Sequence, residues 1–215
     1  MTAGPLADVS PAWSPDGRSI AFVRGVNEKR AIYLIPPLRG GERTVADGIF
    51  DQMSWSPDGR FLAVPEAPSL QSKSSSLYLI AIESGDKFRL TTPPNATTKD
   101  ISPAFSPNGR VLLFNRCGGP FHCDLYTLEI ATDYRPTGAP RLLRKEGNDI
   151  RGAAAWTIDG KEAVYAVSLD GGWNHRLIRV GIGTGAKPQY LKFAGENTGS
   201  RRSPIRGTGS PTYST

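Results

Sequence analysis

The chain has 215 residues, 38% of them hydrophobic, and a formal net charge of +6. A chain of this length buries a substantial core, but its longest apolar runs fall well short of the roughly 18 residues that a membrane-spanning helix needs. The positive charge does not favour a nucleic-acid partner, because +2 of it lies in the tail beyond residue 195 and the rest is interleaved with acidic residues. We therefore predict neither a membrane span nor direct nucleic-acid binding by this segment.

One sequence pattern occurs four times along the chain, at residues 12–22, 54–64, 104–114 and 155–165. Each copy has an aromatic residue, then a turn such as Ser56-Pro57-Asp58-Gly59, then a run of strand formers. Proline presets the second turn position, serine can bond the turn amides, and Asp-Gly tolerates the remaining turn conformations. The pattern therefore predicts a tight turn between two antiparallel strands in each copy.

The turn glycines lie 42, 50 and 51 residues apart, a period typical of propeller blades or solenoid units. Each interval has room for two more strands, which we expect at 31–35 and 42–45, 77–82 and 88–91, 124–130 and 141–143, and 176–180 and 189–191. Four strands per unit predict an all-β protein, a β-propeller of about four four-stranded antiparallel blades. The expected propeller segment is 1–195, with blades at approximately 8–47, 48–95, 96–146 and 147–194.

The predicted blades form an open arc or a fragment of a larger propeller, because no strand precedes Ala7 that could complete the sheet of the fourth unit. Packing between neighbouring sheets is expected to bury the repeated aromatic residues Trp13, Trp55, Phe105 and Trp156. The first six residues lack the features of a secretory signal and are typical of a loop leading into an inner strand.

Binding residues of propellers usually lie on one rim or over the central channel. The rim opposite the repeated turns is expected to carry the loops between units and those between the second and third strands. The candidate rim residues are Asp8, Asp51, Asp100, Asp149, Trp173 and His175. They define a ligand site, or alternatively the aspartates only cap turns.

Cys117 and Cys123 flank a short loop between two predicted strands. A disulfide is expected if the domain is exported, with two free thiols as the alternative. Zinc is disfavoured, because these cysteines and His122 offer no fourth ligand nearby. Neither a Gly-x-Ser-x-Gly motif nor a His-Glu-x-x-His motif is present, so we predict a protein that is not an enzyme and uses no metal or other cofactor.

The repeats, with Trp-Ser-Pro-Asp-Gly-Arg followed by Ile-Ala-Phe at residues 13–22, resemble the TolB-type, WD-repeat-like β-propeller repeat. The resemblance covers residues 8 to about 193, and Asn108 and Ile158 depart mildly from it. Residues 32–43 and 90–94 resemble the C-terminal propellers of bacterial winged-helix transcriptional regulators or serine/threonine kinases. That resemblance implies a sensor or interaction module within a larger protein.

Our leading hypothesis is a non-catalytic module whose rim binds a protein or a small ligand. The first alternative is the gating propeller of a prolyl-oligopeptidase-like hydrolase whose catalytic domain is missing. The second is a periplasmic envelope protein similar to TolB. The sequence does not decide the compartment: periplasmic if the propeller is attached to a membrane-anchored regulator, otherwise cytoplasmic.

Residues 196–215 abandon the strand pattern where a fifth inner strand is due, so we predict a disordered tail. In a shifted reading frame, codons for residues 207–213 can encode part of another strand. We therefore expect the tail to be an out-of-frame remnant of a gene that is frameshifted after about Gly199.

Overall fold

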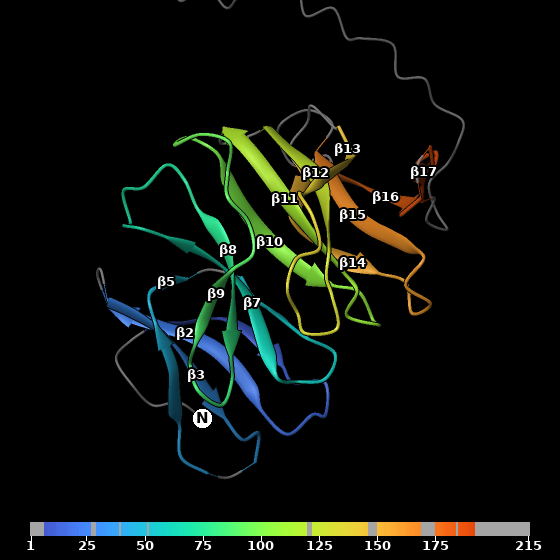
Figure 1. Cartoon of the computed structure of the whole chain (residues 1–215). Coiled ribbons are helices and arrows are strands. Elements are labelled where there is room, and N and C mark those ends of the chain that lie inside the picture. The colour runs from blue at the N-terminus through green and yellow to red at the C-terminus, as the bar shows by residue number, and fades with distance from the viewer. Residues whose placement is uncertain are drawn as a thin grey trace, which may run out of the picture.

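The structure, a computed structural model, describes residues 7–26, 29–38, 40–50, 52–119, 122–145, 150–168, 175–183 and 185–191. Within these residues the regular elements are β-strands, and they form four consecutive antiparallel sheets (Figure 1). The predicted all-β propeller with four four-stranded blades is therefore confirmed. No helical segment in the same ranges has the length and apolarity to cross a membrane. The predicted disordered tail, 196–215, lies outside the described residues.

Each blade is built from strands that are consecutive in the chain. Blade 1 contains β1 (Ala7–Trp13), β2 (Ile20–Val26), β3 (Lys29–Ile35) and β4 (Arg43–Asp47). In blade 2, two short strands, β5 (Ile49–Phe50) and β6 (Ser54–Trp55), both pair with β7 (Phe61–Ala67), which is followed by β8 (Ser76–Ala81) and β9 (Lys87–Arg89). Blade 3 contains β10 (Lys99–Phe105), β11 (Val111–Gly119), β12 (His122–Glu129) and β13 (Arg141–Arg144). Blade 4 contains β14 (Ile150–Trp156), β15 (Glu162–Ser168), β16 (His175–Gly181) and β17 (Gln189–Tyr190).

The repeated turn has the same hydrogen bonds in every blade. In blade 2, the Ser56 hydroxyl donates to Asp58 Oδ1 at 2.6 Å and accepts from the Phe61 amide at 3.0 Å, and the Arg60 amide also donates to Asp58. Gly59 has φ +71°, a left-handed conformation that glycine adopts without steric cost. The side of the propeller that carries these four turns is called the turn face below, and the opposite side the loop face.

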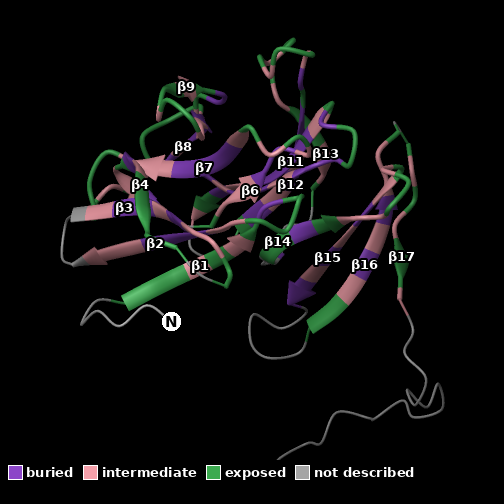
Figure 2. Cartoon of the chain, turned by 90° about the horizontal axis from the view of Figure 1, so that it is seen from below, coloured by how far each residue is buried: buried purple, intermediate pink, exposed green. Residues whose placement is uncertain are grey.

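The core lies between the blades (Figure 2). One cluster joins blades 1 and 2 around Ile32 and Leu62, a second joins blades 2 and 3 around Leu79 and Phe114, and the third joins blades 3 and 4. Each contact between neighbouring blades is called a seam below. Across two seams an indole NH donates to a carbonyl of the preceding blade: Trp55 to Ala12 at 3.0 Å and Trp156 to Ala104 at 2.9 Å.

The expected burial of all four repeated aromatic residues was wrong for the first one. Trp55 and Phe105 are 9% and 8% exposed, and Trp156 is half-buried, whereas Trp13 is 59% exposed. The reason is that extensive contacts among the described strands run only between consecutive blades, so no described blade covers the outer face of blade 1. The four blades therefore follow one another as an arc.

Candidate functional site

Asp8 and Asp100, two of the candidate rim residues, occupy equivalent places on the first strands of blades 1 and 3. Each forms a two-pronged ion pair with an arginine on the neighbouring strand. Arg116 donates to the two carboxylate oxygens of Asp100 at 2.7 and 2.8 Å, and Arg24 donates to those of Asp8 at 2.6 and 2.9 Å. Each carboxylate therefore holds two strands together.

Both arginines also lie over aromatic rings of their own blade. The Arg116 guanidinium carbon is 5.5 Å from the centroid of Phe114 and 4.9 Å from that of Tyr126. The hydrogen bond from Arg116 to Asp100 raises the pKa of Arg116, although burial opposes this shift. In blade 3 the pair is covered by blade 2, and the Asp100 side chain is completely buried. Asp100 is thus a structural residue within a seam.

Of the remaining rim candidates, the structure describes His175. His175 is exposed at the start of β16, opposite Ser168 in the strand register. Asp51, Asp149 and Trp173 lie outside the described residues. Within the described part of the chain, no group of three or more His, Cys, Asp or Glu side chains is arranged to hold a metal ion.

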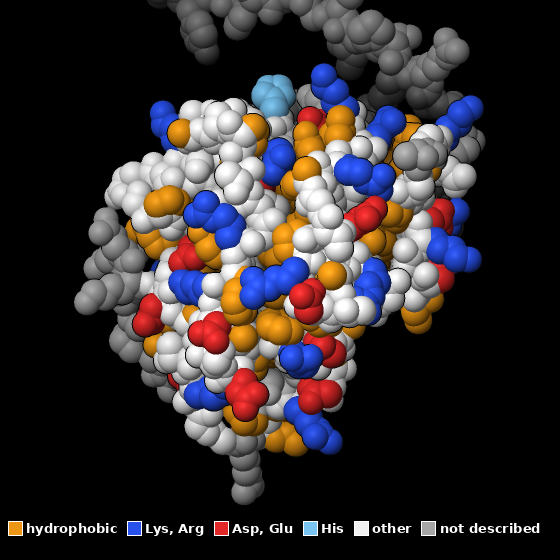
Figure 3. All heavy atoms as spheres, in the orientation of Figure 1, with side chains coloured by type: hydrophobic (Ala, Val, Ile, Leu, Met, Phe, Trp, Pro, Cys, Tyr) orange, Lys and Arg blue, Asp and Glu red, His pale blue; other side chains and the backbone are white. Residues whose placement is uncertain are grey.

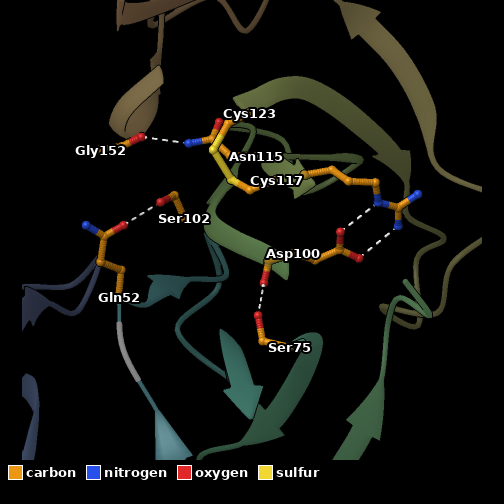
Figure 4. Close-up of a disulfide and its surroundings, with 9 residues drawn as sticks. Gln52, Ser75, Asp100, Ser102, Asn115, Cys117, Cys123 and Gly152 are labelled. Carbon is orange, nitrogen blue, oxygen red and sulfur yellow. Dashed lines mark hydrogen bonds and ion pairs between the residues drawn. A yellow bond between two sulfur atoms is a disulfide. The ribbon is translucent and has the colours of Figure 1, made fainter. Parts of the chain in front are cut away.

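The two cysteines are opposite each other on β11 and β12 and form a disulfide (Figure 4). Both are 5% exposed and pack in the core cluster between blades 3 and 4, with Leu125, Ile150 and Val167. Two residues before Cys117 on β11, Asn115 donates from Nδ2 to the Gly152 carbonyl of blade 4 at 2.9 Å. The disulfide therefore ties together the hairpin on which blade 4 packs.

Next to this hairpin the loop face is hollowed by a groove of about 540 Å³ between blades 2 and 3. We call it the rim groove. Its lining residues are Leu70, Gln71, Ser72, Lys73, Thr97, Lys99, Cys117, Gly118 and Gly119. The sequence predicted that loops between second and third strands lie on this rim, but it did not single out Lys73 or Lys99. No local sequence signal brings these two lysines, from different blades, to one place.

Hydrogen bonds between the blades hold the walls of the rim groove. Ser75 forms a parallel bridge with Lys99; its carbonyl accepts from the Asp100 amide at 3.0 Å, and its hydroxyl donates to the Asp100 carbonyl at 3.0 Å. Figure 4 shows Ser75 and the Asp100 ion pair close to the disulfide. The groove is therefore preformed, and the charged side chains that line it are two exposed lysines.

The face of the molecule drawn in Figure 3 carries charges of both signs. Figure 3 shows lysine and arginine side chains interleaved with aspartate and glutamate over one face of the arc, with apolar side chains between them. The charged side chains in the described lining of the rim groove are both positive. A groove lined by two lysines is electrostatically complementary to an anionic group of limited size.

The sheets, the repeated turns and the inter-blade contacts define a β-propeller of the repeat type described above. The sequence pattern of the family described as "TolB beta propeller domain" matches residues 2–167, and the chain belongs to this family.

Similarity to individual proteins extends over part of their length. TolB from Acinetobacter baumannii superposes with a TM-score of 0.68 and 21% identity, over 86% of this chain and 43% of that one. Prolyl oligopeptidase B from Galerina marginata gives a TM-score of 0.61 and 14% identity, over 88% of this chain and 29% of that one. A Bacillus subtilis protein named "Uncharacterized peptidase YuxL" is 28% identical over 53% of this chain and 22% of its own length. The chain thus spans about a fifth of that relative and less than half of that TolB.

Proposed function

We propose that this propeller is a non-catalytic interaction module whose rim groove binds an acidic peptide segment of a partner protein. The observation that carries the proposal is the preformed groove, in which Lys73 and Lys99 are the charged members of the described lining and no described lining residue is acidic. Carboxylates of an incoming segment gain charge-assisted hydrogen bonds from the lysines. The half-exposed Leu70, at 40%, offers an apolar contact next to them.

The module serves as the sensing or regulatory part of a larger signalling or transcription-regulating protein. Two facts support this role: its family is one of propeller domains, and the chain spans only part of the relatives described above. Regulation then follows from occupation of the rim by the partner segment.

Binding of short fluorescent peptides tests the rim groove. We expect a peptide rich in aspartate and glutamate to bind, and a lysine-rich peptide of equal length not to bind. The double variant Lys73→Glu, Lys99→Glu is expected to lose about 100-fold in affinity, because two attractive charges become repulsive. Lys161→Glu, on the turn face of blade 4, is the matched control and should bind as the parent does. Equal binding by the double variant would refute the proposal.

A second candidate function is the gating propeller of a prolyl-oligopeptidase-like hydrolase. It is favoured by the structural similarity to prolyl oligopeptidase B and by the name of the Bacillus relative. The gene neighbourhood distinguishes the two. A downstream frame with a Gly-x-Ser-x-Gly motif supports the gating role, and an upstream winged-helix or kinase frame supports the regulatory one. A signal sequence in the upstream frame would instead support a periplasmic protein similar to TolB.

A further inference from the structure

On the turn face, the seam between blades 2 and 3 is filled by a side chain from an outer loop. The connection between β12 and β13 inserts Tyr134 there, with its ring centroid 4.9 Å from that of Phe61 and 5.9 Å, edge-on, from that of Phe105. The Tyr134 hydroxyl is hydrogen-bonded to Asp58 and Ser56 of the blade 2 turn. This seam therefore holds a tyrosine side chain by two aromatic contacts to its ring and by hydrogen bonds to its hydroxyl.

The loop that carries Tyr134 is built to present it. Tyr134 itself has φ +63°, its amide donates to the Ala131 carbonyl at 3.1 Å, and the Ala131 amide donates to the Arg135 carbonyl at 2.8 Å. The Arg135 guanidinium lies 3.9 Å from the centroid of the Phe88 ring in blade 2. These contacts hold the loop of blade 3 in place, so that the Tyr134 side chain fills the space next to the blade 2 turn.

In the equivalent seam between blades 1 and 2, no described side chain takes the place of Tyr134. This seam contains a pocket of about 460 Å³ on the turn face. Four of its lining residues repeat the positions around Tyr134: Ser14 for Ser56, Asp16 for Asp58, Trp55 for Phe105 and Gly59 for Gly109. We call it the tyrosine pocket.

Two differences in sequence leave the tyrosine pocket open. The connection between β8 and β9 in blade 2 is a short turn of residues 82–86, in which Ser84 and Asp86 are bonded to each other, and it contains no aromatic residue. In addition, Ser19 stands where blade 2 has Phe61. The pocket therefore keeps the polar anchor and apolar walls of its neighbour, including Leu34, Ile35 and Ile82.

We propose that the tyrosine pocket binds an unmodified tyrosine side chain that a partner protein presents on a loop. The phenol ring packs against Trp55 and the aliphatic wall, and its hydroxyl donates to the Asp16 carboxylate. This pocket lies on the face opposite the rim groove, and its occupation does not depend on the function proposed for that groove.

The charges at the pocket select the unmodified residue. Asp16 and Asp58 line it together with Arg43, whose guanidinium donates to the Ile82 carbonyl at 3.0 Å. A phosphate on the tyrosine would meet two carboxylates and one arginine that is already engaged. Phenylalanine would fill the apolar part but would not form the additional hydrogen bond to Asp16, whose carboxylate already accepts from Ser14 and the Arg18 amide.

The test uses the sequence that fills the neighbouring seam. A fluorescent peptide of residues 131–136, and versions with phenylalanine or phosphotyrosine in place of Tyr134, are titrated with the full chain by anisotropy. We expect the tyrosine peptide to bind, and the other two to bind about tenfold more weakly. Absence of binding at millimolar concentration, or equal binding by all three, would overturn the proposal.

Three variants locate the binding. Asp16→Asn removes the charged acceptor while keeping the turn, because Asn108 makes the same turn hydrogen bonds in blade 3, and should weaken binding about tenfold. Ser19→Phe restores the ring that contacts Tyr134 in the filled seam and should strengthen binding several-fold. Asp159→Asn, the same substitution in blade 4, should change nothing. Binding that is insensitive to both Asp16→Asn and Ser19→Phe would place the peptide elsewhere and refute the assignment.

Discussion

The repeated turn shows how the same residue has different roles in different blades. Gly17 and Gly109 both have φ +69°. A Cβ added to Gly17 would meet no atom within 4 Å, whereas one added to Gly109 would lie 3.3 Å from the Tyr134 hydroxyl and 3.4 Å from Pro57 Cδ. The two positions therefore separate the cost of the backbone conformation from that of blade packing.

This pair of glycines leads to the first prediction. Gly17→Ala should destabilise the chain by about 1–2 kcal/mol, the cost of a left-handed backbone for an L-residue. Gly109→Ala should cost more, because its Cβ also crowds the seam between blades 2 and 3. Urea denaturation of both variants measures the difference. Equal losses would mean that Tyr134 and Pro57 move aside freely.

The buried ion pair of blade 3 leads to a second prediction. Asp100→Ala leaves the guanidinium of Arg116 without its partner inside a seam, and we expect a loss of about 3–5 kcal/mol. Asp8→Ala is the matched control on the open face of blade 1, where Arg24 keeps its hydrogen bonds to Glu42, and should cost much less. Urea denaturation measures the loss of unfolding free energy in both variants. Comparable losses would contradict the expectation that burial makes the Asp100 ion pair costlier to break.

The turn aspartates predict how stability depends on acid pH. Burial alone would raise the pKa of Asp58, but hydrogen bonds from Ser56, the Arg60 amide and Tyr134 outweigh it and hold this pKa below the ordinary value of 3.8. A carboxylate with a lowered folded pKa stabilises the protein above its unfolded pKa, and this stability is lost as the pH falls through the folded pKa.

We therefore expect the contribution of Asp58 to the free energy of unfolding to be constant above about pH 5. Below about pH 4 this contribution should fall as the carboxylate is protonated. Asp58→Asn should reduce that acid-dependent loss, because the amide does not titrate, and Asn108 shows that asparagine supports the turn. Thermal unfolding of both proteins at a series of pH values tests this. An unchanged pH profile for the variant would count against the proposed hydrogen bonds.

At the level of elements, the hairpin of β11 and β12 depends on a covalent link as well as on strand pairing. Cys117 and Cys123 are separated by six positions in the sequence, so their disulfide closes a short loop. Their side chains belong to the core shared with blade 4. Breaking the link therefore affects both the hairpin and the seam beside it.

Reduction should lower the stability of the oxidised protein by about 2 kcal/mol, the lower end of the usual range, because the closed loop is short. The double variant Cys117→Ser, Cys123→Ser should be less stable than the oxidised parent and should not respond to reductant. Urea denaturation with and without dithiothreitol measures both effects. An oxidised parent that is indifferent to reductant would contradict the prediction.

At the level of the whole molecule, none of the described blades covers the outer face of blade 1. Trp13, at the position where Trp55 and Trp156 donate to a preceding blade, is 59% exposed. Exposed apolar faces of this kind promote association, so we expect the isolated chain to self-associate at high concentration.

Sedimentation velocity over a range of concentrations tests this expectation. Trp13→Glu should shift the chain towards the monomer by placing a charge on the open face. Leu38→Glu, at a position that is 92% exposed away from the sheet, should leave the association unchanged. A parent chain that is monomeric at every concentration would refute the prediction.

The sequence by itself determined the turns, the strands and their grouping into blades. These features are local: Ser56, Asp58 and Gly59 specify a turn within a few residues, and runs such as Val111–Phe114 pair with the next segment of the chain. The period of the repeat then predicts the fold. For the same reason the opposition of Cys117 and Cys123 across a short hairpin could be foreseen as one of two alternatives.

Only the tertiary structure decided what lies between the blades. It placed Asp100 in a buried ion pair, gathered Lys73 and Lys99 in the rim groove, and inserted Tyr134 between two blades while leaving the preceding seam open. These contacts join residues of different blades, and no local pattern encodes which side chain will face another across a seam. The same lack of a covering blade left Trp13 exposed, although its sequence context matches that of the buried Trp55.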